Sequence, residues 1–423
     1  MLRKSVIVFL AIICGTLPVF SQVVSGTSSD YLGRRNTITS AVPFLLIAPD
    51  SRSGAMGDIG AATSADVMSQ HHNPAKYVFS QNKAGVSISY SPWLKALVND
   101  IHLLYVAGYW KITDMDAISM SLRYFSLGNI DFTDMYGNAI MSHTPNEFAI
   151  DMNYSRKLTD VLSMAITPRL IYSDLTGRQF ASGVETKAGV AGAADLSLFY
   201  EQDFSSKTLR NQTLRIGLNI SNIGNKMSYA TGTMRRDFIS TNLKLGLGYS
   251  MDFDDYNRLT FVGEINKLLI PTPPVYAEDS TGQTVYDDAG NPVIAAGKDP
   301  NVSVAQGIFQ SFYDAPGGFV EEMREYNWAL GMEYVYRDLL AVRFGYFNES
   351  KYKGGRKYFT IGAGVKYNIL GIDVSYLFAV NQNHPLENTL RFTLTFDFAS
   401  FKSSEIKNQG KLLKNSGISN QIR

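Results

Sequence analysis

The residues of this chain that could do chemistry are few, and the first group is a set of three glycines. Gly54, Gly57 and Gly60 follow an apolar run, a position in which a glycine-rich turn suggests a phosphate-binding loop. Their spacing is Gly-x-x-Gly-x-x-Gly, whereas the dinucleotide-binding fingerprint is Gly-x-Gly-x-x-Gly and opens a βαβ unit with an acidic residue further on. No such unit follows, so we expect no nucleotide and no other cofactor to bind here.

The second group is a pair of adjacent histidines, His71 and His72, which suggests a metal site. Neighbours in sequence rarely point at one ion, and no third ligand lies near them in the sequence. The remaining histidines, His102, His143 and His384, stand in no nucleophile motif. We therefore expect neither a metal centre nor an enzyme, with a Ser/His pair of the kind that outer-membrane phospholipases place on a barrel as the alternative.

The first 21 residues have the pattern of a secretory signal peptide. Arg3 and Lys4 form the charged start, residues 6–13 the apolar core, and residues 19–21 the cleavage site before Gln22. Cys14, the only cysteine, leaves with this peptide. Lipidation of Cys14 is the alternative, but a bulky isoleucine precedes it. We therefore expect an exported mature chain without a thiol, a disulfide or a thiolate metal site.

Composition narrows the class of protein. Lys and Arg total 39 against 38 acidic residues, so there is no positive field of the kind that nucleic-acid binding requires. The chain holds 24 Tyr, 24 Phe and 35 Gly with only 18% charge, which fits a chain rich in β-structure. No stretch of eighteen apolar residues appears in the mature part. We therefore exclude nucleic acid as a partner and expect strands.

Residues 84–399 read as fourteen segments, each apolar at every second position, joined by connections that alternate between short and long. A transmembrane barrel has this rhythm, because its periplasmic turns are short while its outer loops are free to grow. The pattern predicts an all-β fold, a fourteen-stranded antiparallel transmembrane β-barrel with an N-terminal plug in its lumen. The predicted turns are residues 113–116, 157–160, 253–257, 337–339 and 368–371, with a longer one at 202–211, and the predicted outer loops are residues 128–146, 174–187, 223–240 and 267–324.

The two faces of each segment differ in polarity. In the last segment Leu390, Phe392 and Leu394 alternate with Arg391 and Thr393, so the first set should meet lipid and the second the lumen. The opposite faces carry both signs of charge, which is consistent with a polar network that holds the plug or with a lumen that binds or conducts ions. The predicted lumen charges are Asp151, Arg169, Asp195, Arg215, Lys244, Glu264, Glu333, Arg343, Lys366, Asp373, Arg391 and Asp397.

Pro168 falls inside the fifth segment. A proline removes one donor from a strand ladder, so Pro168 is a candidate kink that opens the wall locally. The alternative is a proline tolerated near a strand end.

Residues 22–83 precede the first strand and do not alternate, and they contain the most specific signal in the chain. The run from Thr37 to Asp58, followed by Ala61–Ser64 and by His72–Lys76, resembles the PorV family of the type IX secretion system of Bacteroidetes. The Asn73-Pro74-Ala turn before the first strand is also similar to the broader FadL family of fatty-acid channels. In those relatives this region forms a plug inside a fourteen-stranded barrel.

The resemblance implies a bacterial outer-membrane protein that acts as a shuttle. Such a protein would bind the C-terminal signal domain of secreted cargo, receive it from the secretion translocon, and deliver it to an attachment complex that contains the sortase PorU. Membrane lipids would surround the barrel. The alternative implied function is a FadL-like channel for hydrophobic small molecules, which an apolar pocket through the plug would favour. A polar, filled lumen beneath apolar loop tips would favour the shuttle.

The loop at residues 267–324 is too long to be a passive connector. Val304, Ile308, Phe309 and Phe312 recur at three- and four-residue spacing, which predicts a short helix with an apolar stripe that ends before residues 316–318. We expect this stripe to fold over the barrel mouth or to contact cargo, with packing on the base of its own loop as the alternative.

The last segment, residues 400–423, is polar and basic, and its composition predicts disorder. Contact with a periplasmic partner or with lipid headgroups is the alternative. Its charged residues are Lys402, Lys407, Lys411, Lys414, Arg423 and one acid, Glu405.

Overall fold

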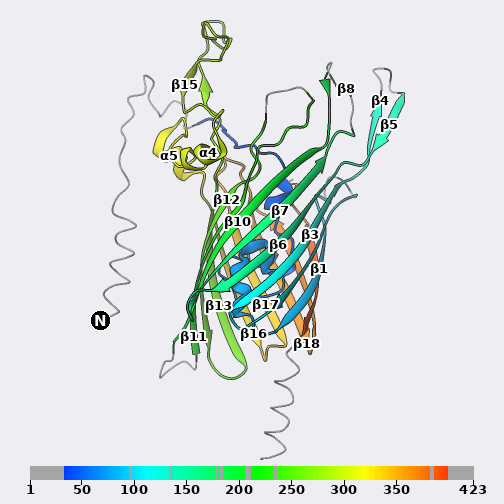
Figure 1. The fold of residues 1–423 in the computed structure, drawn as a ribbon, viewed down its shortest axis with the longest axis vertical. Coiled ribbons are helices and arrows are strands. Elements are labelled where there is room, and N and C mark those ends of the chain that lie inside the picture. Colours follow the sequence, from blue (N-terminus) through cyan, green and yellow to red (C-terminus); the bar gives the residue numbers. More distant parts are fainter. Residues whose placement is uncertain are drawn as a thin grey trace, which may run out of the picture.

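In the computed structural model, fourteen antiparallel strands close into one barrel (Figure 1), as the sequence predicted. The structure describes residues 33–398 except 96, 97, 99, 134, 135, 137, 178, 179, 182, 183, 205–210, 232–235 and 382–384, so the signal-peptide and tail predictions lie outside the described residues. In wall order the strands are β1 (Ala84–Pro92), β2 (Ile101–Lys111), β3 (Asp116–Leu127), β6 (Asn146–Lys157), β7 (Leu162–Asp174), β10 (Gly189–Phe204), β11 (Asn211–Gly224), β12 (Asn242–Asp252), β13 (Asn257–Leu268), β16 (Asn327–Tyr336), β17 (Leu340–Asn348), β18 (Lys357–Tyr367), β19 (Leu370–Ala379) and β20 (Leu390–Phe398).

The barrel closes between its first and last strands. β1 pairs with β20 from Ala84 opposite Phe398 to Tyr90 opposite Phe392. Closure leaves no unpaired sheet edge, which hydrocarbon would not tolerate. The predicted faces are confirmed, because Arg391 is 2% exposed while Phe392 beside it is 44% exposed. The apolar belt therefore faces outward and the charges face inward.

Short turns join the strands at one end of the barrel and long loops at the other. Three of the long loops contain a small hairpin of their own, which strand periodicity in the sequence did not reveal. Among the described residues, no helix has the length and apolarity needed to cross a membrane. The hairpins are β4 (Ile130–Thr133) with β5 (Ala139–His143), β8 (Phe180–Ala181) with β9 (Val184–Glu185), and β14 (Val275–Tyr276) with β15 (Ile294–Ala296).

The segment before β1 lies inside the lumen, where Figure 1 shows its short helices within the ring of strands. It packs against the inward faces of opposite walls: one helix contacts β18 to β20, and another contacts β6, β7 and β10. Phe44 of the plug, for example, is buried and stacks on Phe125 of the wall, with ring centroids 6.2 Å apart. The plug helices are η2 (Pro43–Leu46), α2 (Ser51–Gly54), α3 (Ser69–His72) and η3 (Pro74–Phe79).

Pro168 lies in β7 and perturbs one of its two ladders. On the β10 side it pairs with Ala194, next to a register shift between Ala194 and Leu196. On the β6 side the register runs to Asp151 opposite Arg169 and resumes only at Tyr154 opposite Ile166. The proline thus interrupts pairing with one neighbour, while the strand itself is continuous and the barrel is closed. Whether the wall opens here stays a prediction.

Candidate functional site

The three glycines of the plug allow it to lie directly against other chain segments. A Cβ on Gly54 would collide with the side chain of Arg391, and one on Gly60 would collide with the ring of His72. Gly57 has φ +76° and lies so close to β17 that a Cβ would sit 2.9 Å from the carbonyl oxygen of Tyr346. The glycines therefore serve close packing and one left-handed backbone position rather than a phosphate.

Asn73 and Pro74 fasten the plug to the wall. The Asn73 amide donates hydrogen bonds to the carbonyl of Leu198 on β10 at 2.9 Å and to that of Ala61 at 3.2 Å, while its oxygen accepts from the Ala75 N–H at 3.1 Å and caps η3. The carbonyl of Pro74 accepts a 2.8 Å hydrogen bond from Ser155 on β6. The Asn-Pro-Ala turn is therefore a structural anchor that joins the plug to two strands.

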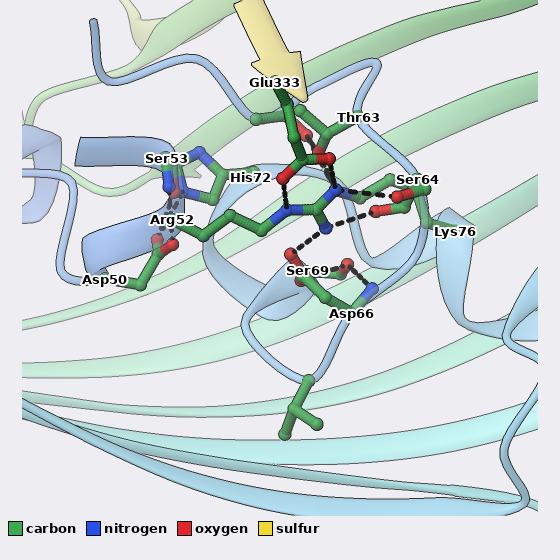
Figure 2. Close-up of polar contacts among 12 residues, drawn as sticks. Asp50, Arg52, Ser53, Thr63, Ser64, Asp66, Ser69, His72, Lys76 and Glu333 are labelled. Carbon is green, nitrogen blue, oxygen red and sulfur yellow. Dashed lines mark hydrogen bonds and ion pairs between the residues drawn. The ribbon is translucent and has the colours of Figure 1, made fainter. Parts of the chain in front are cut away.

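Arg52 of α2 ties the floor of the plug to the opposite wall (Figure 2). Its guanidinium donates to both oxygens of Glu333 on β16, at 3.0 and 2.8 Å, and to Asp66 of the plug at 2.8 Å. It also donates to the backbone and side chain of Ser64. A bidentate pair of this kind fixes orientation as well as position. No sequence pattern pointed to Arg52, because its partner Glu333 lies 281 residues away.

Asp50, Ser53 and His72 come together in the same part of the plug (Figure 2), but not as a catalytic relay. His72 Nε2 lies 2.9 Å from Asp50 and 2.7 Å from Ser53, and Ser53 also donates directly to Asp50. A nucleophilic triad needs the two ring nitrogens to face the acid and the nucleophile separately, whereas here one nitrogen faces both. The neighbouring His71 instead accepts from Arg123 on β3 at 2.6 Å, so the adjacent histidines face different partners.

The predicted lumen charges form ion pairs with each other and with the plug. Arg169 lies between Asp151 at 2.5 Å and Asp195 at 3.0 Å. Glu264 accepts hydrogen bonds from the backbone N–H groups of Gly60 at 3.0 Å and Ala61 at 2.8 Å. These contacts favour the interpretation of the lumen charges as a network that holds the plug.

One large cavity remains in the lumen, below the plug at the end of the short turns. It has a volume of about 830 Å³ and reaches from the α2 region of the plug to the turns that follow β16 and β18. Its lining is strongly charged, and this cavity is called the vestibule below. The ionisable residues that line it are Asp50, Arg52, Asp66, Glu201, Asp203, Arg215, Asp252, Arg258, Glu333, Arg337, Asp338, Arg343, Lys366, Asp373 and Asp397.

At the opposite end, the longest outer loop carries the predicted helix as α4 (Val304–Gln310), whose N-terminus is capped by Ser303. Only part of the predicted stripe is exposed: Phe309 is 70% and Phe312 39% exposed, while Val304 and Ile308 are half-buried. Gly307 faces the loop's base, where a Cβ would meet the ring of Phe238 at 2.8 Å. The helix thus packs on the base by one face and presents the phenylalanines on another.

Sequence reasoning missed a second helix, α5 (Gly318–Met323), because Pro316 and two glycines read as the end of helical structure. Proline and glycine do end α4 before this point, but a new helix begins at Gly318. It adds exposed apolar side chains close in sequence to those of α4, a signal that the spacing of residues 319, 320 and 323 could have provided. Together the exposed residues, called the α4–α5 surface below, are Phe309 (70%), Phe312 (39%), Tyr313 (58%), Phe319 (69%), Val320 (51%) and Met323 (45%).

Beneath this surface lies a buried cluster of carboxylates. Asp314, Glu322 and Glu325 place oxygens within 4.8 Å of one another, a spacing that a divalent cation would bridge. Positive charge is already supplied by lysine: Lys267 at the end of β13 lies 2.8 Å from Glu322 and 2.6 Å from Glu325, and Lys353 lies 2.9 Å from Glu325. The cluster therefore acts as an ion-pair clamp that joins α5 to the barrel rim.

The clamp carries unequal protonation. Burial, together with the charges of Glu322 and Glu325, raises the pKa of Asp314 to about 7. Burial would also raise the pKa of Glu325, but Lys267 and Lys353 outweigh it and hold that pKa below its ordinary value. Asp314 is thus the member of the clamp that changes charge near neutral pH.

Comparison with solved structures finds distant barrels. The chain is similar to a FadL homologue of Pseudomonas aeruginosa (13% identity, 86% of this chain and 99% of that one, TM-score 0.41) and to the toluene transporter TbuX of Ralstonia pickettii (11%, 82% and 98%, 0.42). It is also similar to the toluene transporter TodX of Pseudomonas putida (9%, 82% and 98%, 0.47). No curated protein matches the chain.

Comparison with family models is decisive. The model described as type IX secretion system protein PorV matches residues 31–275, which is more than half of the chain and covers the plug together with the strands from β1 to β13. A closed barrel with an apolar exterior and a charged interior places the protein in the bacterial outer membrane. The chain therefore belongs to the PorV family of type IX secretion system proteins.

Proposed function

We propose that this protein uses the α4–α5 surface to bind the C-terminal signal domain of secreted cargo. In this proposal it receives cargo from the secretion translocon and passes it to the attachment complex that contains the sortase PorU. The observation that carries the proposal is the set of six large apolar side chains held at the outer end of a plugged barrel. Exposed apolar side chains gathered on one loop are typical of protein interaction sites.

The base of this surface is held in place, which favours specific binding. Lys267 and Lys353 clamp α5 from below, and Thr272 donates to Asp314 from its backbone N–H at 3.0 Å and to Glu325 from its hydroxyl at 2.6 Å. Binding to an ordered surface avoids much of the entropy cost of ordering a flexible loop. The aromatic side chains Phe309, Phe319 and Tyr313 are of the kind that commonly dominate binding energy at interfaces.

A channel for hydrophobic small molecules is the competing function. Its support is the interrupted register at Pro168, which is where a side opening would form. Against it, the vestibule is lined by charged side chains, and the plug above it is fastened to the wall by Arg52 and Asn73. An apolar solute would have to cross these groups, so the polar lumen weighs toward protein binding.

In this proposal the chain itself catalyses nothing. The one place where serine, histidine and aspartate meet, among the residues that the structure describes, has His72 Nε2 directed at both Asp50 and Ser53, and all three residues are buried. Any covalent attachment of cargo then belongs to the sortase.

The test replaces Phe309 and Phe319 by aspartate, at the native chromosomal locus. Both side chains are exposed, so the barrel should fold normally, and its level is checked by the heat-dependent shift of folded barrels on gels. We expect cargo bearing the C-terminal signal domain to co-purify at least about tenfold less, since losing two aromatic anchors costs more than about 1.4 kcal/mol. Cargo delivery to the cell surface should fall in parallel.

The matched control places aspartate at Tyr286, which is 62% exposed on the same outer loop but outside the α4–α5 surface. This control should bind and deliver cargo normally. Normal cargo capture by the double variant, at normal barrel levels, would refute the docking role. These point changes are sharper than deletion of residues 297–318, which would also remove Asp314 from the clamp.

A further inference from the structure

The charges that line the vestibule do not balance. Nine carboxylates and six cationic side chains line it, a net charge of −3. The vestibule lies at the end of the short turns, which is the periplasmic end of an outer-membrane barrel. It therefore presents a negative field to the periplasm.

The imbalance arises because single arginines are shared between two acids. Arg258 lies 2.7 Å from Asp252 and 3.3 Å from Asp338. Arg343 is shared in the same way between Glu333 at 2.6 Å and Asp373 at 2.5 Å. Arg52, at the roof of the vestibule (Figure 2), serves Glu333 and Asp66.

Further carboxylates lie at the rim. Asp203 near the end of β10 is exposed and accepts only a hydroxyl hydrogen bond, from Thr213 at 2.7 Å, among the described contacts. Asp338 is exposed as well, with 77% of its side chain accessible. These groups are available to a cation that approaches from the periplasm, and low-dielectric walls focus such a field.

The chain itself supplies a polycation at this place. β20 ends at Phe398, and Asp397 beside it lines the vestibule and pairs with Lys366. Residues 399–423 follow directly, with five basic residues and one acid, a side-chain charge of +4. Four residues of extended chain span at most about 14 Å, so Lys402 is within reach of the rim.

We propose that the basic segment 399–423 is the ligand of the vestibule, bound by charge to its carboxylates and closing the periplasmic mouth of the barrel. The opposite charges match in sign and nearly in size, and the covalent link at Phe398 makes the encounter intramolecular. A link of this kind gives a high effective concentration, so individually weak ion pairs suffice. The binding should weaken steeply with salt, because the groups at the rim are exposed to solvent.

The test uses the full mature chain in neutral detergent micelles with a nitroxide label at Ser404→Cys. The only cysteine of the sequence is Cys14, within the predicted signal peptide, so the label should be unique. The label's rotational correlation time is measured by electron paramagnetic resonance. We expect it to be about threefold longer in about 0.1 M than in about 1 M salt, since the screening length falls from about 10 Å to about 3 Å.

A vestibule variant then assigns the site. Asp203→Asn with Asp338→Asn lowers the vestibule charge from −3 to −1 and should free the label at low salt. The control, Asp279→Asn with Asp287→Asn, makes the same change of charge in the outer loop, where both aspartates accept hydrogen bonds from the turns they hold. This control should leave the label slow.

Two results would overturn the proposal. One is a label equally mobile at both salt concentrations. The other is a label that stays slow in the vestibule variant, or slows only when vesicles containing phosphatidylglycerol are added, because the segment would then bind elsewhere or bind lipid headgroups.

Discussion

Gly57 tests most directly how the plug is held, because two independent constraints meet at this residue. Its φ of +76° is a left-handed conformation that costs other residues about 1–2 kcal/mol. A Cβ would also approach the Tyr346 carbonyl of β17 to 2.9 Å. We expect Gly57→Ala to loosen the plug without opening the barrel, which hydrogen exchange of residues 50–60 in the folded protein would show as faster exchange.

The control is Gly33→Ala, since a Cβ on Gly33 would have no neighbouring atom within 4 Å and the backbone there has an ordinary φ. Unchanged exchange in Gly57→Ala would mean that the plug adapts to the added methyl group, and the close-packing role of the glycines would be wrong.

At the same scale, the sequence showed that the three glycines and the Asn-Pro pair matter for the turn that precedes the first strand. It did not show what they contact. Arg391, Tyr346 and Leu198 lie more than a hundred residues away from the glycines and Asn73 that they meet, and only barrel closure places them there. Identifying such partners requires the register of every strand between them.

At the scale of elements, the clamp under α5 should respond to pH through Asp314. Its pKa in the folded protein, about 7, is above the ordinary value of 3.8, so folding favours the protonated form. This contribution to stability is fully present below about pH 4 and is lost as pH rises through about 7. Asp314→Asn cannot ionise and keeps an acceptor for the Thr272 N–H.

We therefore expect Asp314→Asn to stabilise α4 and α5 at pH 8 and to change little at pH 4. Hydrogen exchange of residues 304–325 at the two pH values measures this, with Asp287→Asn, an exposed site on the same loop, as the control. Faster exchange of the variant at pH 8 would show that the ionised carboxylate is needed there.

The same loop shows where element prediction failed. The apolar spacing from Val304 to Phe312 identified α4, since a helical face is a local pattern. Helix α5 escaped because its stability comes largely from Glu321, Glu322 and the following Glu325, whose partners Lys267 and Lys353 belong to other parts of the chain. Local propensity is a weak guide to a six-residue helix that depends on tertiary contacts.

For the whole molecule, the outward apolar belt should behave as a lipid contact. Leu247 lies in the middle of β12 and is 56% exposed. We expect Leu247→Arg to cost about 2–4 kcal/mol when the barrel is folded in phospholipid vesicles, the cost of a cation near the bilayer midplane. Urea denaturation in vesicles measures the loss.

Two controls frame this measurement. Leu247→Phe keeps the site apolar and should be nearly neutral, and Val285→Arg adds the same charge on the outer loop, where the side chain is 37% exposed. An equal stability of Leu247→Arg and Val285→Arg in vesicles would mean that this face of β12 does not meet hydrocarbon.

The amino-acid sequence by itself determined the strands, their inward and outward faces and the alternation of short turns with long loops. Each of these is a local pattern of period two, written in residues such as Leu390, Arg391 and Phe392. Tertiary structure alone decided the pairing of β1 with β20, the hold of Arg52 on Glu333, the clamp under α5 and the net charge of the vestibule. These join residues from distant strands, and their partners are fixed only when the cylinder closes with one register, because a shift of a single residue would turn every inward charge toward lipid.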